Sequence, residues 1–471
     1  MLNDLPEDVL MDVFARLPVK SLLQFKCVCK SWYAIIRDPI FITKHVNHQS
    51  ALSNNGYLAI TRRGGTFGGK CLISLVSYET YREILKITIP FTKEHGRAPF
   101  RIVGSCNGVL CLNVSKLGDT IFLFNPATSE FKKLPKPDRF DELNSYQLGD
   151  DIDVSIGLGF GDDAKSNDYK LVRIFSSKMV GGKVYSEVDV YSLRTNSWRR
   201  KDKLVLGTVM NNSFSRAFIN GALHWRGATS VAVSNLIISF GIRDEVCRCI
   251  ELPEFDWDGN EMYEWFPFVM KESLAVVICS GFQMICNIWV MNEYGINESW
   301  TKQLRVEPIC VDRLAGCGRN EELLFVKGSR MFVYDQQRLK PLRDIIKQNF
   351  IGIDLASIIF LDYIFGIDVA SCELEVVNHI ESLVTIEGTK VLVKREYKKG
   401  WFRENFIFLF LVLILIVFIG YHWYYYSTRQ NGFPSRNIPK TIRYDNYFCL
   451  YYFFVLMYNF LLWEELIKWV Q

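Results

Sequence analysis

Two glycine-rich segments have spacings close to those of phosphate-binding loops, and each lacks a residue that the chemistry needs. Residues 64–71 read Gly-Gly-Thr-Phe-Gly-Gly-Lys-Cys, which is nearly a P-loop. However, Cys71 stands where Ser or Thr would hold magnesium, and residues 72–76 read as a strand where a P-loop continues as a helix. Residues 157–161 read Gly-Leu-Gly-Phe-Gly, without the third glycine at dinucleotide spacing. Neither segment predicts nucleotide binding.

The cysteines and histidines do not predict a metal site. Cys27/Cys29 and Cys247/Cys249 are separated by one residue, whereas zinc knuckles use two to four. On a helix, positions i and i+2 point apart, so Cys27 and Cys29 would not share one ion. The six histidines show no paired spacing, apart from two at a domain boundary. A Cys/His nucleophilic pair stays open but no residue favours one. We therefore expect no catalytic residue, no metal and no cofactor, in a protein that is not an enzyme in its own right.

Residues 4–32 contain two short amphipathic helical patterns. Asp4 can cap the first helix, and Pro6 fits its first turn, where a missing N–H costs nothing. The apolar face of this helix consists of Val9, Leu10, Val13, Phe14 and Leu17. Pro18 ends the pattern, and Ser21 can cap a second helix. The second apolar stripe consists of Leu22, Phe25, Val28, Cys29 and Trp32. Helices this short are marginal alone, so they either dock on a partner or belong to a larger core.

The segment from Leu2 to Lys44 resembles an F-box, the module that attaches substrate receptors to the Skp-type adaptor of a cullin-based ubiquitin ligase. The match lies in a Leu-Pro start at residue 5, Leu-Pro-Val-Lys-Ser-Leu at 17–22 and Val-Cys-Lys-Ser-Trp at 28–32. The resemblance implies an adaptor-facing surface and supporting core formed by Leu5, Pro6, Leu10, Leu17, Pro18, Leu22, Val28, Lys30 and Trp32. The sequence does not separate the residues that touch the adaptor from those that hold the helices together.

Charge and cysteine content restrict the partners and the compartment. The chain has 471 residues and a net charge of +4, of which residues 1–45 contribute +1 and residues 391–471 contribute +5. The 345 residues between them therefore carry −2, without the basic stripe that nucleic-acid binding requires. The 13 cysteines are an odd number without a regular framework, and no apolar signal run begins the chain. We expect a reducing compartment, cytoplasmic or nuclear, and no nucleic-acid partner.

Residues 55–390 have a β pattern with a loose repeat. Each unit is a strand, a polar turn of about six residues, and a second strand that opens with a large apolar side chain. The units align on Phe124, Tyr191, Phe240, Met291 and Tyr334, at intervals of 67, 49, 51 and 43 residues. Such periods are typical of propeller blades. An irregular β-sandwich with similar hairpins is the alternative.

This β region is similar to the F-box-associated domain of many plant F-box proteins, whose fold is propeller-like or kelch-like. The matching segments, in order, are residues 104–111, 125–128, 159–161, 166–172, 220–225, 288–291 and 298–301. Within that family, Trp300-Thr301-Lys302 and residues 379–384 resemble the S-locus F-box proteins of pollen, which recognise style ribonucleases in self-incompatibility. The resemblance implies a protein target and a substrate-binding role for the domain.

Most of the motifs have a structural interpretation. Asn107 and Asn220 precede glycine and can supply the positive φ of tight hairpin turns. Trp198, Trp225, Trp289 and Trp300 fall in β segments, which favours blade core over ligand cages. We expect the target to be bound by loops at one face. The candidate loops are Arg62–Lys70, Asp138–Asp151, Ser176–Lys183 and Asp256–Glu264, and a solvated connection without a role is the alternative for each.

The C-terminal tail contains two apolar runs. Residues 406–426 are long enough to cross a bilayer, and residues 447–463 are a weaker candidate. The basic residues before the first run agree with a cytosolic F-box, but those between the runs would then lie outside, which the positive-inside tendency disfavours. A membrane anchor and translated non-coding sequence from a faulty gene model both explain the tail, which the family resemblance does not cover.

We therefore predict a mainly β fold with three parts: an adaptor-binding α-helical F-box over residues 1–45, a propeller-like β domain over 46–390, and a hydrophobic tail over 391–471. The predicted function is substrate recognition in a Skp–cullin–F-box ubiquitin ligase, which leads to ubiquitination and proteasomal degradation of a protein target such as a style ribonuclease. The alternatives are a protein-binding module without a ligase role, a membrane-anchored F-box receptor for an unrelated target, and an enzyme with a site at the propeller centre.

Overall fold

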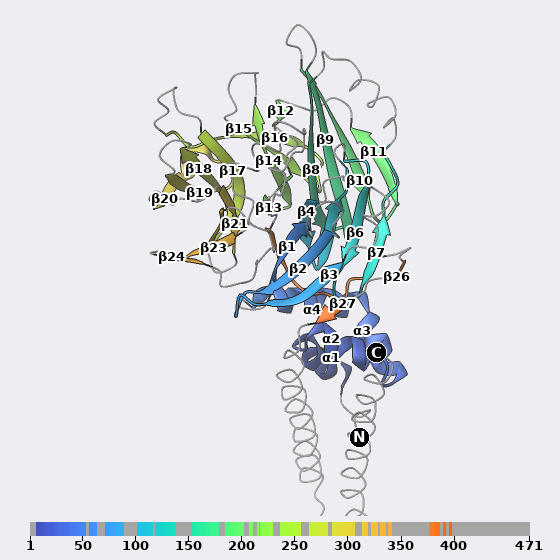
Figure 1. The fold of residues 1–471 in the computed structure, drawn as a ribbon. Helices are drawn as coiled ribbons and strands as arrows, with labels where there is room; N and C mark the ends of the chain where they lie inside the picture. The colour runs from blue at the N-terminus through green and yellow to red at the C-terminus, as the bar shows by residue number, and fades with distance from the viewer. Residues whose placement is uncertain are drawn as a thin grey trace, which may run out of the picture. The chain divides into compact units, whose positions relative to one another are not determined.

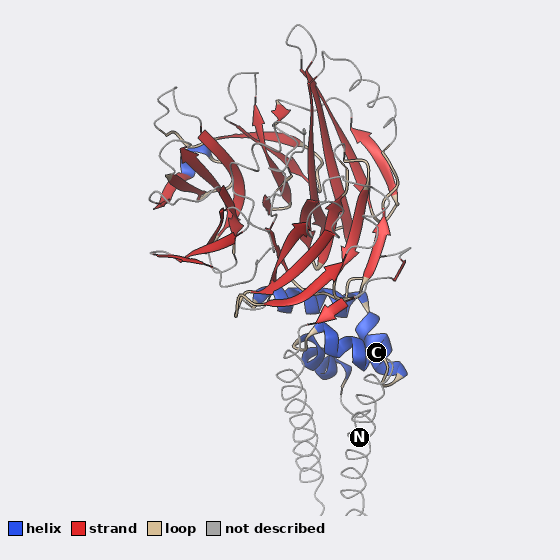
Figure 2. Cartoon of the chain, in the orientation of Figure 1, coloured by secondary structure: helices blue, strands red, loops and turns tan. Residues whose placement is uncertain are grey.

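Helices and strands occupy separate parts of the chain in the computed structural model. The described α-helices all precede the first described strand, and the later described elements are strands and one 3-10 turn at Asn297–Ser299. Figure 2 distinguishes the described helices from the strands. The structure describes residues 6–52, 56–63, 71–88, 101–115, 118–137, 153–178, 184–201, 207–210, 214–215, 217–228, 236–255, 263–280, 285–306, 313–318, 322–327, 330–335, 338–341, 376–386, 390–391 and 395–397. The predicted tail segments 406–426 and 447–463 lie outside these residues.

The described helices include none with the length and apolar character that a membrane span requires. They are α1 (Glu7–Ala15), α2 (Val19–Phe25), α3 (Lys30–Arg37) and α4 (Pro39–Ala51) (Figure 1). Phe14 lies at the centre of their core, with its ring centroid 5.0 Å from that of Trp32 and 5.8 Å from that of Phe25. Residues 26–29 form a turn that divides the second predicted helix into α2 and α3. The core of the four-helix module therefore contains the buried members of the two predicted stripes: Leu10, Phe14, Leu17, Leu22, Phe25 and Trp32.

The start of α2 differs from the predicted one. Pro18 is the N-cap residue, with φ −60° and ψ 147°, and its carbonyl oxygen accepts hydrogen bonds from the N–H groups of Ser21 and Leu22 at 3.0 and 3.2 Å. Ser21 lies inside the helix and is buried. The prediction of Ser21 as the cap is wrong because the fixed φ of Pro18 already suits a helix start, three residues earlier. The other predicted cap, Asp4, lies outside the described residues.

Two buried side chains join α4 to the end of α1. His45 Nε2 lies 3.0 Å from the carbonyl oxygen of Leu17, and Gln49 Nε2 donates to the carbonyl oxygen of Ala15 at 3.1 Å. Carbonyl groups at the end of a helix lack partners within the helix, and these contacts supply them. The helical module therefore continues through α4 to Ala51, past the predicted boundary at residue 45.

The described strands form six antiparallel sheets, which are the blades of a six-bladed β-propeller. Blade 1 consists of β25 (Val376–His379), β1 (Tyr57–Arg63), β2 (Cys71–Ser77), β3 (Glu83–Thr88) and β27 (Arg395–Tyr397). Blade 2 consists of β4 (Arg101–Cys106), β5 (Val109–Asn113), β6 (Ile121–Asn125), β7 (Glu130–Lys133) and β26 (Lys390–Val391). Blade 3 consists of β8 (Asp153–Asp163), β9 (Asp168–Lys178), β10 (Val184–Ser192) and β11 (Ser197–Lys201).

The remaining three blades follow the same order along the chain. Blade 4 consists of β12 (Thr208–Val209), β13 (Ala217–Ile219), β14 (Ala222–Ala228), β15 (Leu236–Gly241) and β16 (Cys247–Glu251). Blade 5 consists of β17 (Tyr263–Met270), β18 (Ser273–Ser280), β19 (Cys286–Met291) and β20 (Trp300–Val306). Blade 6 consists of β21 (Arg313–Cys317), β22 (Leu323–Lys327), β23 (Arg330–Asp335) and β24 (Arg338–Pro341).

The inner strands of neighbouring blades contact one another around a closed ring. β25 lies beside β4, β4 beside β8, β8 beside β12 and β14, and β14 beside β17; β17 then lies beside β21, which returns to β25. Apolar clusters fill the space between successive blades. One cluster, for example, joins Val172 and Val190 of blade 3 to Leu223 and Trp225 of blade 4. The core is thus divided into layers between blades, so the propeller prediction is confirmed over the sandwich alternative.

Residues from the far end of the domain complete blade 1 and join it to blade 6. β25 pairs with β1, with His379 opposite Tyr57. The neighbouring Asn378 accepts a hydrogen bond from the Tyr78 hydroxyl group, and its Nδ2 donates to the carbonyl oxygen of Cys317 at 3.2 Å. The first and last blades are therefore tied together by side chains as well as by the strand ladder.

The segment after β25 is held against blade 2. Asn125 Nδ2 donates to the carbonyl oxygens of Ser382 and Val384 at 3.1 and 2.7 Å. Leu383 is fully buried between them. At Gly108, which has a φ of +81°, a side chain would overlap Ser382. Three of the sequence motifs that carry the family resemblance therefore meet here, and their role is to close the ring.

The predicted repeat corresponds to the third and fourth strands of five blades. Its alignment residues lie in β6, β10, β15, β19 and β23: Phe124, Tyr191, Phe240, Met291 and Tyr334. The equivalent hairpin of blade 1 is β2–β3, which the repeat did not include. Its connection, residues 78–82, reads Tyr-Glu-Thr-Tyr-Arg and lacks the Asn, Asp and Gly residues that mark the other turns.

Each blade has a turn end and a loop end. At the turn end, short connections join the third strand to the fourth and, in every blade except blade 1, the first strand to the second. The φ angles of Asn107 (47°) and Asn220 (52°), each followed by a glycine with positive φ, confirm the predicted hairpin turns. At the loop end, the second strand leads to the third and the fourth leads to the next blade. The predicted loops 62–70, 138–151, 176–183 and 256–264 all leave strands at this end, and most of their residues lie outside the described ones.

Alternate glycines in β8 allow blade 4 to approach blade 3. Residues 157–161 alternate glycine with Leu158 and Phe160, so one face of the strand has no side chains. A Cβ added to Gly159 would lie 2.6 Å from Cζ2 of Trp225. Trp225 is fully buried, and its Nε1 donates to the carbonyl oxygen of Leu158 at 3.0 Å. The segment with dinucleotide-like spacing is therefore a strand that serves interblade packing.

We expect Gly159→Ala to lower the free energy of unfolding by about 1–3 kcal/mol, because the added methyl group would overlap Trp225 unless a blade moves. Denaturant unfolding followed by tryptophan fluorescence measures the loss. The control is Gly104→Ala in the inner strand of blade 2, where an added Cβ meets no atom closer than 3.5 Å. Equal losses in the two variants would contradict this explanation of the glycines.

Two buried histidines link neighbouring elements of the propeller. His224 Nδ1 lies 3.1 Å from the carbonyl oxygen of Ala217, and its Nε2 lies 2.8 Å from the Tyr294 hydroxyl group. His379 Nδ1 lies 3.0 Å from Ser105 Oγ. Burial lowers the pKa of His224 to about 4 and that of His379 to about 3. Both imidazoles are therefore neutral at pH 7.

These lowered pKa values predict a loss of stability in mild acid. A histidine in the unfolded chain has a pKa of about 6.5, so below that pH the unfolded state binds protons that the folded state does not. Between about pH 6.5 and pH 5, each histidine should lower the free energy of unfolding by about 2 kcal/mol. Urea unfolding across this range measures the slope. His379→Gln should reduce the slope, and a slope equal to that of the wild type would refute the assignment.

Candidate functional site

The nine predicted adaptor-binding residues separate into a buried and an exposed group. The buried group consists of Leu10, Leu17, Leu22 and Trp32. The exposed group consists of Pro6, Val28 and Lys30. Pro18 is half-buried, and Leu5 lies outside the described residues. The buried side chains form the core of the helical module, so only the exposed ones are available to a partner.

Exposed apolar side chains are concentrated in the helical module. The described residues include eight large hydrophobic side chains that are exposed, and five of them lie within residues 6–52. These five are Val9, Val28, Tyr33, Ile40 and Leu52. The helical module is much the smaller part of the described chain. The helical module therefore exposes more large apolar side chains than the much larger propeller does among the described residues.

Val28 occupies the tip of the turn between α2 and α3. Its side chain is 61% exposed, and the adjacent Cys27 and Cys29 are exposed too. The turn is held by Cys29, whose Sγ accepts a hydrogen bond from the N–H of Trp32 at 3.5 Å and so caps α3. The turn therefore presents an apolar side chain that its own helices do not cover. Burial of a valine at an interface would contribute about 1.5–3 kcal/mol.

The start of α4 presents a second exposed apolar residue. Asp38 caps this helix, since its carboxylate accepts hydrogen bonds from the N–H groups of Ile40 and Phe41 at 2.6 and 3.3 Å. Ile40 is 75% exposed, whereas Phe41 is fully buried. The cap thus sets the direction of the helix so that one apolar side chain enters the core and its neighbour faces outward.

No metal or catalytic site is assembled from the predicted candidates within the described residues. They contain no group of three or more His, Cys, Asp or Glu side chains that could hold an ion. Cys27 and Cys29 flank a turn, so the helix argument against a shared ion does not apply to them, although no third ligand joins them. Of the histidines near the domain boundary, His45 binds the end of α1. Residues 72–76 lie in the strand β2, as expected, and residues 64–70 lie outside the described ones.

The tryptophans of the propeller contribute to packing. Trp225 and Trp300 are buried, and Trp198 and Trp289 are partly buried against the apolar clusters between blades. Trp300 Nε1 donates to the carbonyl oxygen of Glu251 at 3.0 Å and so joins blade 5 to blade 4. The prediction that these residues form blade core is confirmed.

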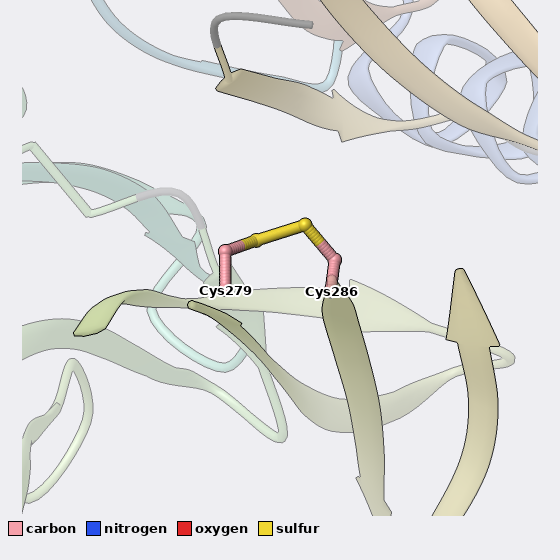
Figure 3. Close-up of a disulfide and its surroundings, with 2 residues drawn as sticks. All are labelled: Cys279 and Cys286. Carbon is pink, nitrogen blue, oxygen red and sulfur yellow. A yellow bond between two sulfur atoms is a disulfide. The ribbon is translucent and has the colours of Figure 1, made fainter. Parts of the chain in front are cut away.

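A disulfide joins Cys279 and Cys286 across β18 and β19 (Figure 3). The spacing of the cysteines in the sequence does not indicate this pair. Six residues separate the two cysteines, and they become partners only because the strands pair with Cys279 opposite Cys286. Two alternating apolar segments on either side of a short connection were the available signal.

Two protein domain families match the chain. The F-box domain matches residues 2–44, and the F-box associated beta propeller domain matches residues 70–386. Relatives in Arabidopsis thaliana include F-box/kelch-repeat protein At3g23880, which is 30% identical over 317 residues, covering 64% of this chain and 80% of the relative. F-box protein CPR1 is 26% identical over 371 residues, covering 75% and 82%. F-box protein At3g07870 is 28% identical over 327 residues, covering 65% and 73%.

The division into core and surface predicts a large loss of stability for one truncation in the helical module and almost none for another. Leu22→Ala should lower the free energy of unfolding of this module by about 2–5 kcal/mol, because Leu22 is fully buried. Val28→Ala should change it by less than about 0.5 kcal/mol, because Val28 is exposed. Hydrogen exchange of the α1 and α2 amides reports the stability of the module in the full chain. Similar protection in the two variants would contradict the division.

Proposed function

Because the chain belongs to the plant F-box proteins that carry an F-box associated beta propeller domain, we propose that it is a substrate receptor of a Skp–cullin–F-box ubiquitin ligase. F-box proteins generally have this role: the F-box binds the Skp-type adaptor, and the adaptor binds cullin. F-box and propeller domains are typical of non-catalytic receptors. The role places the protein in the cytoplasm or nucleus.

The observation that carries this proposal is the apolar surface of the helical module. A closed core leaves Val28 and Ile40 outside, and a partner that buried them would gain from removing their apolar surface from water. We assign the adaptor contact to the exposed residues Pro6, Val28 and Lys30, with Leu10 and Leu22 as support from within. Lys30 adds a charge at the rim, which fits the usual anatomy of an apolar interface core with a polar margin.

We assign the protein target to the loop end of the propeller. The turn end is built from short turns, and part of it is used by the closing segment that Asn125 holds. The loop end is where the strands flanking all four predicted target-binding loops terminate. Loops can vary in sequence while the blades keep their packing, which suits recognition of one particular protein.

The receptor accelerates ubiquitin transfer by proximity. It holds lysines of the target near a conjugating enzyme carried by the cullin complex, so the gain comes from a high effective concentration and not from a reacting group of this chain. A binding module without a ligase role would need the same propeller but would not bring adaptor and cullin with it. Capture of adaptor and cullin therefore distinguishes a ligase receptor from a binding module without a ligase role.

The identity of the protein target is independent of the ligase role. The resemblance to S-locus proteins rests on Trp300–Lys302 and residues 379–384. The structure uses Trp300 for interblade packing and residues 379–384 for ring closure, so these segments support the fold and do not identify a target. A style ribonuclease remains a prediction for the capture experiment. Membrane anchoring rests on residues 406–426, outside the described residues, and fractionation of the full chain tests it.

We expect Val28→Asp in the full chain to reduce capture of the adaptor at least about tenfold, because an interface would have to bury the new carboxylate. Affinity capture with mass spectrometry measures adaptor and cullin together. Proteins that still bind the variant are target candidates, and a style ribonuclease among them would support the pollen role.

The matched control is Val246→Asp, the same change at a 38% exposed valine of the propeller. It should leave adaptor capture unchanged. Equal capture of adaptor by wild type and Val28→Asp, with α1 and α2 equally protected from exchange, would sink the assigned contact. Absence of the adaptor from every capture would leave the propeller as a binding module without a ligase role.

A further inference from the structure

Cys279 and Cys286 lie side by side at the loop end of blade 5. They occupy opposite positions in β18 and β19, with their Cα atoms 4.1 Å apart and their sulfur atoms bonded (Figure 3). One position nearer the connection, the N–H of Ser280 donates to the carbonyl oxygen of Ile285 at 3.0 Å. The disulfide therefore closes a small ring that includes the connection between the two strands.

The two strands are held in place by packing that does not involve the disulfide. Leu274 and residues 275–278 of β18 are buried, as are Ile288 and Val290 of β19. The buried side chains contribute to apolar clusters on both faces of the blade. Because these contacts and the strand ladder are independent of the bond, reduction would leave the two sulfur atoms as neighbours. The pair can then form the bond again without refolding of the blade.

The two cysteine residues differ in their exposure to solvent. Cys286 is 7% exposed and belongs to the buried cluster between blades 5 and 6. Cys279 is only partly buried and lies at the margin of the same cluster. Thiol–disulfide exchange requires direct attack on one sulfur, and access decides which one. An external thiolate would therefore attack Cys279 and release Cys286.

Cys106 and Cys111 are the other described cysteines on neighbouring paired strands, and they are not placed to form such a bond. Seven of the described cysteines are free. Cys106 and Cys111 belong to neighbouring strands of blade 2, but they face Val109 and Gly104 across the ladder and not each other. Their burial raises the pKa of both thiols well above the ordinary value, which keeps them protonated and unreactive. At Cys279 and Cys286 a bonded pair of sulfur atoms coincides with partial exposure of one of the two residues.

We propose that Cys279 and Cys286 form a reversible dithiol–disulfide site whose exchange partner is a small thiol or disulfide of the glutathione class. The inference rests on the proposed function in one respect: a receptor for a cullin-based ligase works among reduced thiols, where disulfides are usually transient or redox-sensing. Its position at the loop end of blade 5 assigns the site to the face where we place the target.

The exchange is balanced by the partner molecule. In oxidation, the thiolate of Cys279 attacks one sulfur of the small disulfide and releases the first small thiolate. The thiolate of Cys286 then attacks Sγ of Cys279, forms the protein disulfide and releases the second small thiolate. The two cysteines lose two electrons and two protons, and the small disulfide is reduced to two thiols. Excess small thiol reverses both steps.

The test is a redox titration of the folded full chain with reduced and oxidised glutathione. Acid quenching, alkylation and mass spectrometry of the peptide that contains both cysteines give the fraction oxidised. We expect the pair to change together, with both thiols free or both bonded, and to return when the ratio is reversed. Circular dichroism should show the propeller folded throughout.

Two single variants test which sulfur is attacked. In Cys286→Ser, oxidised glutathione should form a mixed disulfide with Cys279 at least about tenfold faster than with Cys286 in Cys279→Ser, because Cys286 is buried. Equal rates would overturn the assignment of Cys279. A pair that stays as two thiols in excess oxidised glutathione, or a bond that opens only in denaturant, would overturn reversible exchange. Because this experiment does not involve the adaptor, failure of the redox proposal can be distinguished from failure of the proposed receptor function.

Discussion

The ladder between β25 and β1 closes the propeller, and all other interblade contacts depend on this closure. It joins residues about 320 positions apart, and bringing chain ends that distant together costs about 5 kcal/mol in loop-closure entropy. The ladder is reinforced by Asn378 on the side of blade 6 and by Asn125 on the side of blade 2. Without it, blade 1 would lack its inner strand, and β4 and β21 would both lose a neighbour.

Local chemistry explains which parts of the fold were predictable. The hairpins around Tyr191 and Phe240 are recognisable because their turns use Asn, Asp and Gly between alternating apolar residues. The number of blades was not predictable. Blade 1 obtains its inner strand from Val376–His379, and a pairing between distant segments leaves no periodic signal in the sequence. The start of α2 was misplaced because Ser21 and Pro18 both suit a helix terminus, and only the backbone distinguishes them.

The segment that contains the candidate site could be predicted, but the side chains that are exposed on it could not. Leu22 and Val28 belong to one apolar stripe of the sequence, yet one is fully buried and the other is largely exposed. The difference arises because Val28 lies in the turn at residues 26–29 and not in either helix. The disulfide shows the same limit, since the pairing of Cys279 and Cys286 depends on strand register and not on composition. A shift of one or two residues would therefore change both which side chain is exposed and which cysteines pair.

The late position of the closing strand has a consequence for synthesis. The helical module is complete at Ala51, whereas the ring needs residues up to about Ile386. At ordinary translation rates, roughly 20–70 s separate the two events on the ribosome. A nascent chain that stops before Val376 would carry adaptor-binding helices without a closed propeller. Such fragments would occupy the adaptor without delivering a target, so premature termination would yield a competitor of the complete receptor.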